Sequence, residues 1–351
     1  MQRPDLRSLP EDVRNYIEFL ESKITSLEAP RAARTAASRS EAVEREAPVN
    51  EEPIVQEAAS PFQLLTISQQ GAVKRTERHL FSRQHRGGTG VFDLEVQPPD
   101  QPAALACLTA AQHFLVFTNH GRVFRFPSSK LELSPVRSRG EAIFDRIPFE
   151  ADEAVAVILP ERAQGYVAMV SASGRVRSLR HHLFGEHMKP GVSVLNFQDY
   201  GPLAGACWTS GDGDIFLATN NGMGIRFNEK LIPPQGDWGI RLAEGAQVVG
   251  IAAVYDDSRL FLLGADGRGT VRVMPSFAAN KSLGGSGKQT IKNTQVVGIA
   301  ALERNQDLFV LSRLGKLIRF PADEVPETEG VVQGVLCMSL RGDEVVSFLN
   351  C

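Results

Sequence analysis

The sequence lacks the features that mark several large classes of protein. No stretch approaches the ~18 consecutive apolar residues of a membrane-spanning helix, and the N-terminus, MQRPDLRSLPEDV, has no apolar signal-peptide core. The four cysteines form no CxxC pair, so neither a disulfide framework nor a zinc site is expected. Cys107, Cys207 and Cys337 lie in apolar, strand-like runs that are typical of small buried residues. These absences predict a soluble protein of the reducing cytoplasm.

A strong charge of one sign and catalytic motifs are also missing. The chain has 38 basic and 41 acidic residues, so its total charge does not identify a nucleic-acid-binding protein. No HExxH, GxSxG or Cys/His pairing occurs, and neighbouring carboxylates fall at expected hairpin turns. Metal binding by His181, His182 and His187 is not expected from their spacing. The sequence predicts no enzyme, no cofactor and no metal site.

What the sequence does contain is one unit written six times. Its clearest copy is HFLVFTNHGRVFRFP, residues 113–127, in which β-branched and aromatic residues alternate on both sides of a turn-forming glycine. The turn glycines of the six copies are Gly71, Gly121, Gly174, Gly222, Gly267 and Gly315, separated by 50, 53, 48, 45 and 48 residues. Each period has room for four strand-like segments, which predicts an all-β, six-bladed, propeller-like array over residues 61–351.

The region before the repeats predicts a short helix and a linker. Ser8 and Glu11 fit a capping box, and apolar residues at heptad spacing follow over residues 13–27, which predicts a coiled-coil helix within residues 1–28. Residues 29–60 are rich in Ala, Glu, Arg and Pro without a sustained period, which is typical of a disordered linker. A helix this short needs a partner. Self-association is favoured over docking to another protein, because the apolar seam is narrow and regular.

A glycine-rich motif follows the first hairpin: Gln84, His85, Arg86, Gly87, Gly88, Thr89 and Gly90. It resembles the box motif of the C-terminal domain family of DNA gyrase A and topoisomerase IV, which reads Gln, basic, Arg, Gly, Gly, basic, Gly. The stretches GAVKRT, FLVFTNHGRVFRFP and GVLCMSLRGDEVVSFL also look like that domain, so the resemblance covers about residues 62–350. It implies a six-bladed β-pinwheel, with strands exchanged between blades, that bends duplex DNA around its rim.

Two positions of the motif depart from the family, because His85 and Thr89 stand where the family has basic residues. Nothing before residue 62 resembles the breakage-reunion domain, so we expect a stand-alone relative without the topoisomerase. The motif itself has two interpretations. Its glycines let backbone N–H groups approach an anion while Arg86 supplies charge, or they let a loop cross between the first and last blades and close the ring. The two are compatible.

Basic residues recur in the second strand of each hairpin and form the core of the candidate DNA-binding set. They are Lys74, Arg75, Arg125, Arg177, Arg226, Arg272 and Arg319, to which Arg83, Arg86, Arg137, Arg139 and Arg180 are added. We expect one or more per blade at about the same height, forming a ring that contacts phosphates. The alternative is a solvated strand face, where such residues deter edge pairing. Residues 60–189, with 16 basic and 12 acidic side chains, are expected to be the electropositive half.

These observations together predict non-catalytic, largely sequence-independent binding of duplex DNA, with bending or wrapping that affects DNA topology or nucleoid organisation. The expected partners are duplex DNA, a second copy through the N-terminal helix, and a topoisomerase subunit; the expected location is the cytoplasm, at the bacterial nucleoid. The alternative is a protein-interaction propeller or an accessory subunit of a separate topoisomerase. The near-neutral repeat region, with 30 basic and 29 acidic residues, favours that alternative.

Overall fold

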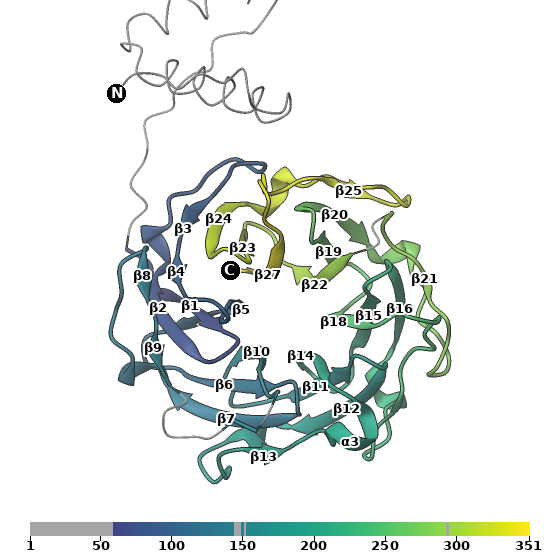
Figure 1. The fold of residues 1–351 in the computed structure, drawn as a ribbon. Coiled ribbons are helices and arrows are strands. Elements are labelled where there is room, and N and C mark those ends of the chain that lie inside the picture. Colours follow the sequence, from purple (N-terminus) through teal and green to yellow (C-terminus); the bar gives the residue numbers. More distant parts are fainter. Residues whose placement is uncertain (1–58, 144–148, 151, 293–294) are drawn as a thin grey trace, which may run out of the picture. The chain divides into compact units, whose positions relative to one another are not determined.

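Residues 59–143, 149–150, 152–292 and 295–351 are described by a computed structural model, and they form a ring of six β-sheets, or blades (Figure 1). The expected helix of residues 1–28 and nearly all of the expected linker lie outside the described residues. Each blade contains one antiparallel hairpin: β1 (Phe62–Ser68) with β2 (Ala72–Glu77), β6 (His113–Thr118) with β7 (Arg122–Pro127), β11 (Tyr166–Ser171) with β12 (Arg175–Arg180), β15 (Asp214–Thr219) with β16 (Met223–Asn228), β19 (Arg259–Gly264) with β20 (Arg268–Val273), and β23 (Asp307–Ser312) with β24 (Lys316–Pro321). The predicted all-β, six-bladed architecture is confirmed.

The six turn glycines have the backbone conformation that the repeat pattern predicts. Their φ angles lie between 73° at Gly121 and 93° at Gly174, in the left-handed region that glycine adopts without steric cost. At Gly121 a Cβ atom would also lie 2.2 Å from the carbonyl oxygen of Leu195. Glycine therefore fixes both the hairpin turn and the close approach of the next chain segment.

The innermost strand of each blade follows its hairpin in the sequence. These strands are β5 (Pro102–Thr109), β10 (Val155–Pro160), β14 (Leu203–Thr209), β18 (Val248–Val254), β22 (Val296–Leu302) and β27 (Val345–Asn350). They surround a central cavity of about 930 Å³. Small residues let neighbouring inner strands approach closely: a Cβ atom on Gly250 would lie 3.0 Å from the backbone nitrogen of Ile299. The apolar core lies between adjacent blades, where Leu, Ile, Val and Phe side chains of neighbouring sheets pack.

The outermost strand of each blade comes from the following repeat. β9 (Glu141–Ala142) pairs with β2, β13 (Val192–Ser193) with β7, β17 (Asp237–Trp238) with β12, β21 (Lys288–Gln289) with β16, β25 (Glu327–Thr328) and β26 (Val335–Leu336) with β20, and β3 (Val91–Phe92) with β24. The first repeat therefore completes the sixth blade, and the ring is closed by exchange of β3. We call these the outer strands, and the edge that they form the rim.

Few elements lie outside this plan. β4 (Leu94–Glu95) pairs in parallel with β8 (Ser138–Arg139), and α3 (Phe197–Tyr200) lies beside β12 at the outer edge (Figure 1). Among the described residues no helix is long and apolar enough to cross a membrane.

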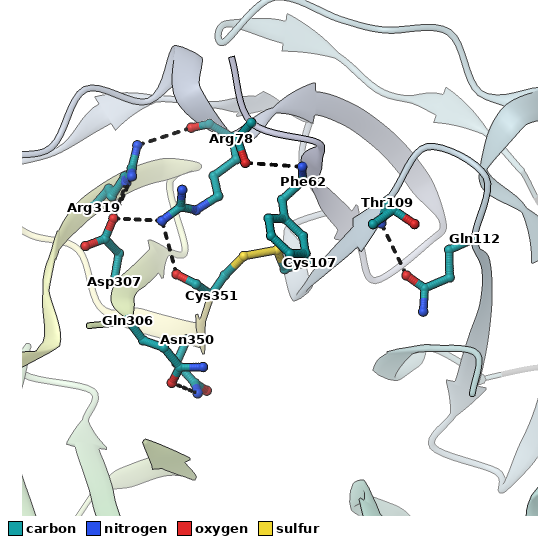
Figure 2. The surroundings of a disulfide bond; sticks show 11 residues. Phe62, Arg78, Cys107, Thr109, Gln112, Gln306, Asp307, Arg319, Asn350 and Cys351 are labelled. Carbon is teal, nitrogen blue, oxygen red and sulfur yellow. Dashed lines mark hydrogen bonds and ion pairs between the residues drawn. A yellow bond between two sulfur atoms is a disulfide. The ribbon is translucent and has the colours of Figure 1, made fainter. Parts of the chain in front are cut away.

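A disulfide joins the two ends of the ring, which corrects the expectation that the cysteines are unpaired. Cys107 of β5 is bonded to Cys351, which follows β27, across a sequence separation of 244 residues (Figure 2). Sequence spacing hides this pair, because only closure of the ring brings β5 and β27 together. Cys207 and Cys337 are free thiols, and burial raises the pKa of each to about 12.

Replacing Cys351 by serine is expected to lower the free energy of unfolding by about 2–4 kcal/mol, because the crosslink restricts the unfolded chain over a long loop. Urea unfolding without reductant measures the difference, and a dithiol reductant should bring the wild type to the same midpoint as the variant. Cys207→Ser is the matched control at a free, partly buried thiol. Equal midpoints for the wild type and Cys351→Ser without reductant would contradict the prediction.

Candidate nucleic-acid interface

Four of the seven hairpin cations are buried, so the expected exposed ring of like charges is wrong for them. Only 2% of Lys74, 6% of Arg226, 2% of Arg272 and 1% of Arg319 is exposed. They also differ in strand position: Lys74 is the third residue of its strand, Arg226 and Arg319 are the fourth, and Arg272 is the fifth. Because successive side chains of a strand point to opposite faces, these cations do not share one face of their blades.

Arg226 and Arg319 hold neighbouring repeats together. The Nε of Arg226 donates to Asp214 over 2.7 Å, and its Nη1 donates to the carbonyl of Phe277 in the next repeat over 3.3 Å. The Nε of Arg319 donates to Asp307 over 2.7 Å, and its Nη1 donates to the carbonyl of Phe81 over 2.9 Å. In both blades the carboxylate is the first residue of the first hairpin strand. The guanidinium thus joins that strand to the segment after the next hairpin.

Asp307 is the centre of a charged cluster at the junction of the last and first repeats (Figure 2). Its carboxylate is 1% exposed and accepts hydrogen bonds from Arg319, from Arg78 over 3.0 Å and from Arg83 over 3.1 Å. Arg78 also donates to the carbonyl of Cys351 over 3.3 Å. Arg83, a predicted DNA contact, is therefore an ion-pair partner of Asp307, although about half of its side chain remains exposed.

Arg272 fixes the outer strand β25 onto the fifth blade. Its guanidinium donates to the carbonyls of Thr290, Thr328 (3.1 Å) and Glu329 (2.6 Å), and lies 5.0 Å from the ring centre of Phe277. Burial lowers the pKa of Arg272, because its charged form loses hydration. A guanidinium so enclosed has no surface to present to a phosphate.

Lys74 anchors the segment that passes from the sixth blade back to the first. Its ammonium group donates to the carboxylate of Asp93, to the carbonyl of Asp93 over 3.0 Å and to the carbonyl of Val136. Thr66 donates to the other carboxylate oxygen of Asp93 over 2.6 Å. Burial lowers the pKa of Lys74 and raises the pKa of Asp93. Asp93 lies between β3 and β4, so this ion pair supports ring closure.

The three remaining hairpin cations are half-buried. Arg125 donates to Glu161 over 3.0 Å, Arg177 donates to the carbonyl of Val194 over 2.9 Å, and the Nε of Arg75 is buried without a hydrogen-bond partner. Phosphate contact by these side chains stays a prediction, but two of them already have protein partners.

The glycine-rich motif lies against the last repeat. Gly87 donates its backbone N–H to the carbonyl of Cys337 over 2.8 Å. Arg86 donates from its backbone and its guanidinium to Glu324 and Leu336, and the ring of His85 lies 3.0 Å from Glu324. These contacts support the ring-closing interpretation. Phosphate binding by exposed Arg86 remains a prediction.

The geometry at Gly90 shows why the motif ends on glycine. Its φ is +67°, and a Cβ atom would lie 2.7 Å from the carbonyl oxygen of Leu317. Any larger residue would push β3 away from β24. Gln84 forms the first contact of the motif, donating its N–H to the carbonyl of Arg319 over 2.8 Å, while Gly88 accepts from Ser339 and Thr89 is exposed.

The last three predicted contacts are exposed. Arg137 donates to Glu95 over 2.5 Å and lies 5.4 Å from the ring centre of Phe92, while Arg180 lies 5.8 Å from the ring of Tyr166. Arg139, on β8, has no ion-pair partner among the described residues. Of the three, Arg139 is the one whose charge is fully available.

Exposed cations without an ion-pair partner in the described part of the chain do occur along the rim. Five lie on an outer strand or within three residues of one, and we call them the rim set: Arg139, Lys189, Arg241, Lys288 and Lys292. They belong to the outer edges of the first four blades. The sequence analysis included only Arg139 among its DNA contacts. The signal for Arg241, Lys288 and Lys292 was their position beside or just after the glycine-rich segments of repeats four and five.

The described residues show no group of three or more potential metal ligands. His181 and His182 have ring centres 5.9 Å apart, and the His181 ring nitrogen lies 3.3 Å from the carbonyl of Gly165. These side chains define no separate chemical site.

Six blades, each completed by a strand from the next repeat, define a β-propeller of the pinwheel type. The DNA gyrase C-terminal domain family (β-propeller) matches residues 63–96, 112–155, 213–254 and 306–351. The ring therefore belongs to the family of DNA gyrase A C-terminal domains, as the resemblance of its motifs indicated.

Sequence and structural relatives agree with this assignment. The DNA gyrase A protein of Staphylococcus epidermidis is 26% identical over 299 residues, covering 81% of this chain and 33% of the relative; that of Staphylococcus aureus is equally similar, with 34% of its length covered. The chain thus spans about a third of the length of these relatives. The structure of a DNA gyrase A C-terminal domain has a TM-score of 0.71 at 19% identity, covering 82% of this chain and 99% of the other. A topoisomerase IV C-terminal domain gives 0.60 at 18%, with 84% and 94% covered, so both share the fold.

Proposed function

We propose that the ring binds duplex DNA along its rim, largely independently of sequence, and bends the duplex as it follows the edge. The observation that carries this proposal is the rim set, whose five cations are exposed and unpaired within the described residues. Cations of this kind bind phosphates and release counterions, which supplies affinity without reading bases. Because the set extends over the edges of four successive blades, a duplex that contacts all five must curve.

The family assignment supports DNA as the ligand, since its members are named for DNA gyrase and topoisomerase IV. On this basis we further propose an effect on DNA topology or nucleoid organisation, and we assign no chemical step to the ring. The candidate partners remain a second copy through the N-terminal helix and a topoisomerase subunit. Tethering two rings would strengthen DNA binding by raising the effective concentration of the second.

A salt titration of DNA binding tests the proposal. The full chain is titrated onto a long linear duplex at several salt concentrations, alongside a variant with all five rim-set residues changed to glutamine. Each lost phosphate contact lowers the slope of log K against log[salt] by about 0.9, so the variant should lose about 4 units of slope and most of its affinity.

Three exposed cations away from the outer strands provide the matched control. Arg162, Arg304 and Arg341 lie in turns next to inner strands and have no ion-pair partner among the described residues. Changing all three to glutamine removes a similar amount of charge and should leave the slope near that of the wild type. Absence of DNA binding at low salt would overturn the proposal and favour a protein-interaction ring.

A further inference from the structure

A second feature of the rim is a cleft between the edges of the third and fourth blades. It has a volume of about 550 Å³ and an apolar surface formed by Trp238, Ile240, Leu242 and Leu283. The segments on its two sides are joined by hydrogen bonds from Gly284 to Gly239 over 3.3 Å and from Arg241 to Gly285 over 2.9 Å. These are the glycine-rich segments of repeats four and five, so the cleft is built by neighbouring outer segments.

Trp238 stands at the mouth of this cleft. It belongs to outer strand β17, where it pairs with Arg175, and 46% of it is exposed. The guanidinium of Arg175 lies 5.0 Å from the ring centre of Trp238 and 4.6 Å from that of Tyr200 in α3. Arg175 thus lies against two aromatic rings, which limits the movement of the indole.

The indole N–H of Trp238 has no acceptor in the described part of the chain. The second tryptophan, Trp208, is 8% exposed and donates its indole N–H to the carbonyl of Pro160 over 2.7 Å, as buried tryptophans usually do. An exposed, unbonded indole beside an apolar cleft is typical of a binding surface.

The charges around the cleft favour an anionic partner. Arg175 and exposed Arg241 flank the indole, and exposed Lys281 and Lys288 lie along the adjacent outer segment of the fourth blade. Against them the cleft has one carboxylate, Asp237, one oxygen of which accepts the backbone N–H of Trp238 over 2.7 Å. A ligand that joins an aromatic ring to negative charge fits this arrangement, and a nucleotide has both.

An aromatic residue at this position is not general among the blades. The outer-strand residues that pair with the first residue of the second hairpin strand are Ala142, Ser193, Trp238, Gln289, Leu336 and Phe92 in blades one to six. Only blades three and six have an aromatic ring there. Phe92 also lies near cations, 5.2 Å from Lys316 and 5.4 Å from Arg137. The pairing of an aromatic ring with cations therefore occurs at specific points of the rim.

We propose that Trp238 stacks against a nucleobase that is unstacked at a kinked step of the rim-bound duplex, with Arg241 at the adjoining phosphate. This inference rests on the proposed DNA binding and deepens it. Bending a duplex around a small ring is easier when one step is kinked, and aromatic or apolar side chains stabilise such kinks. Pyrimidine–purine steps, which unstack most readily, should be preferred at this point.

Tryptophan fluorescence gives a readout specific to this residue. In a Trp208→Phe variant of the full chain, Trp238 is the only tryptophan, and its emission is followed during titration with duplex DNA that carries a central TA step. We expect quenching of the emission and reduced access of acrylamide to the indole. Both changes should be smaller with a duplex of the same length built on an A-tract.

Substitution of Trp238 tests the energetic contribution. Trp238→Ala should weaken binding about 5- to 150-fold with an unchanged salt slope, because stacking contributes affinity without counterion release. Trp238→Phe should restore most of the affinity. Leu231→Ala, which removes an apolar side chain of similar exposure (39%) from a turn away from the outer strands, is the matched control and should bind as the wild type does.

The outcomes separate this inference from the proposed function. If the wild type binds DNA with the expected salt slope while Trp238 emission and the affinity of Trp238→Ala are unchanged, the base contact is wrong and rim binding stands. If no DNA binds, both are wrong. Shielding of Trp238 with rising protein concentration in the absence of DNA would assign the cleft to a second copy of the chain and overturn the base contact.

Discussion

Replacing Asp307 by asparagine is expected to lower the free energy of unfolding by about 3–5 kcal/mol, which is a large part of the stability of an ordinary domain. The carboxylate is almost completely buried and is the acidic partner of Arg319, whose side chain is equally buried. Asparagine keeps the shape of the side chain and removes its charge, so the guanidinium stays enclosed without a counterion. Urea unfolding at neutral pH measures the change from the shift in midpoint.

The fourth blade offers a matched control for this experiment. Asp256 also accepts a hydrogen bond from a buried arginine, Arg226, over 2.5 Å, but the Asp256 side chain is 97% exposed. Asp256→Asn should therefore cause a much smaller change, since exposed partners contribute little. If the two variants unfold at the same urea concentration, the burial of Asp307 is not what gives the pair its effect.

The hairpins were predictable from the sequence because their signals are local. Alternation of apolar residues and a glycine at the turn depend on neighbours within about fifteen positions, and the φ of +88° at Gly71 confirms one of them. The exchange of outer strands is not local. Val91 and Phe92 follow the first hairpin directly, yet they pair with Leu317 and Lys316 of the last one. Composition alone does not show such a pairing, and only the family resemblance implied it.

The roles of the hairpin cations were harder to predict, because strand position and partner decide them. Lys74 and Arg75 are neighbours in the sequence, but one is fully buried and the other half-buried on opposite faces of β2. One signal was available: Asp214 and Arg226, like Asp307 and Arg319, are twelve residues apart at opposite ends of a hairpin. Antiparallel pairing brings such residues together and indicates an ion pair in place of two exposed charges.

Replacing Lys74 by methionine is expected to lower the free energy of unfolding at neutral pH by about 3–5 kcal/mol, because the Asp93 carboxylate would stay buried with Thr66 as its remaining side-chain donor. Burial already raises the pKa of Asp93, and loss of Lys74 should raise it further. The folded variant then binds a proton that the unfolded chain has released. The deficit should therefore be smallest below about pH 4 and should grow as the pH rises from the unfolded pKa towards the folded one.

The double variant Lys74→Met, Asp93→Leu should recover most of this loss, since two apolar side chains of similar volume carry no buried charge. It also decides between two roles for Lys74. If the ion pair only supports ring closure, the double variant folds and binds DNA with the affinity and salt slope of the wild type. If Lys74 contacts phosphate, as its place in the repeat first indicated, the folded double variant loses affinity and about 0.9 units of slope. Because Lys74 Nζ is enclosed by Asp93 and the carbonyl of Val136, we expect the first result.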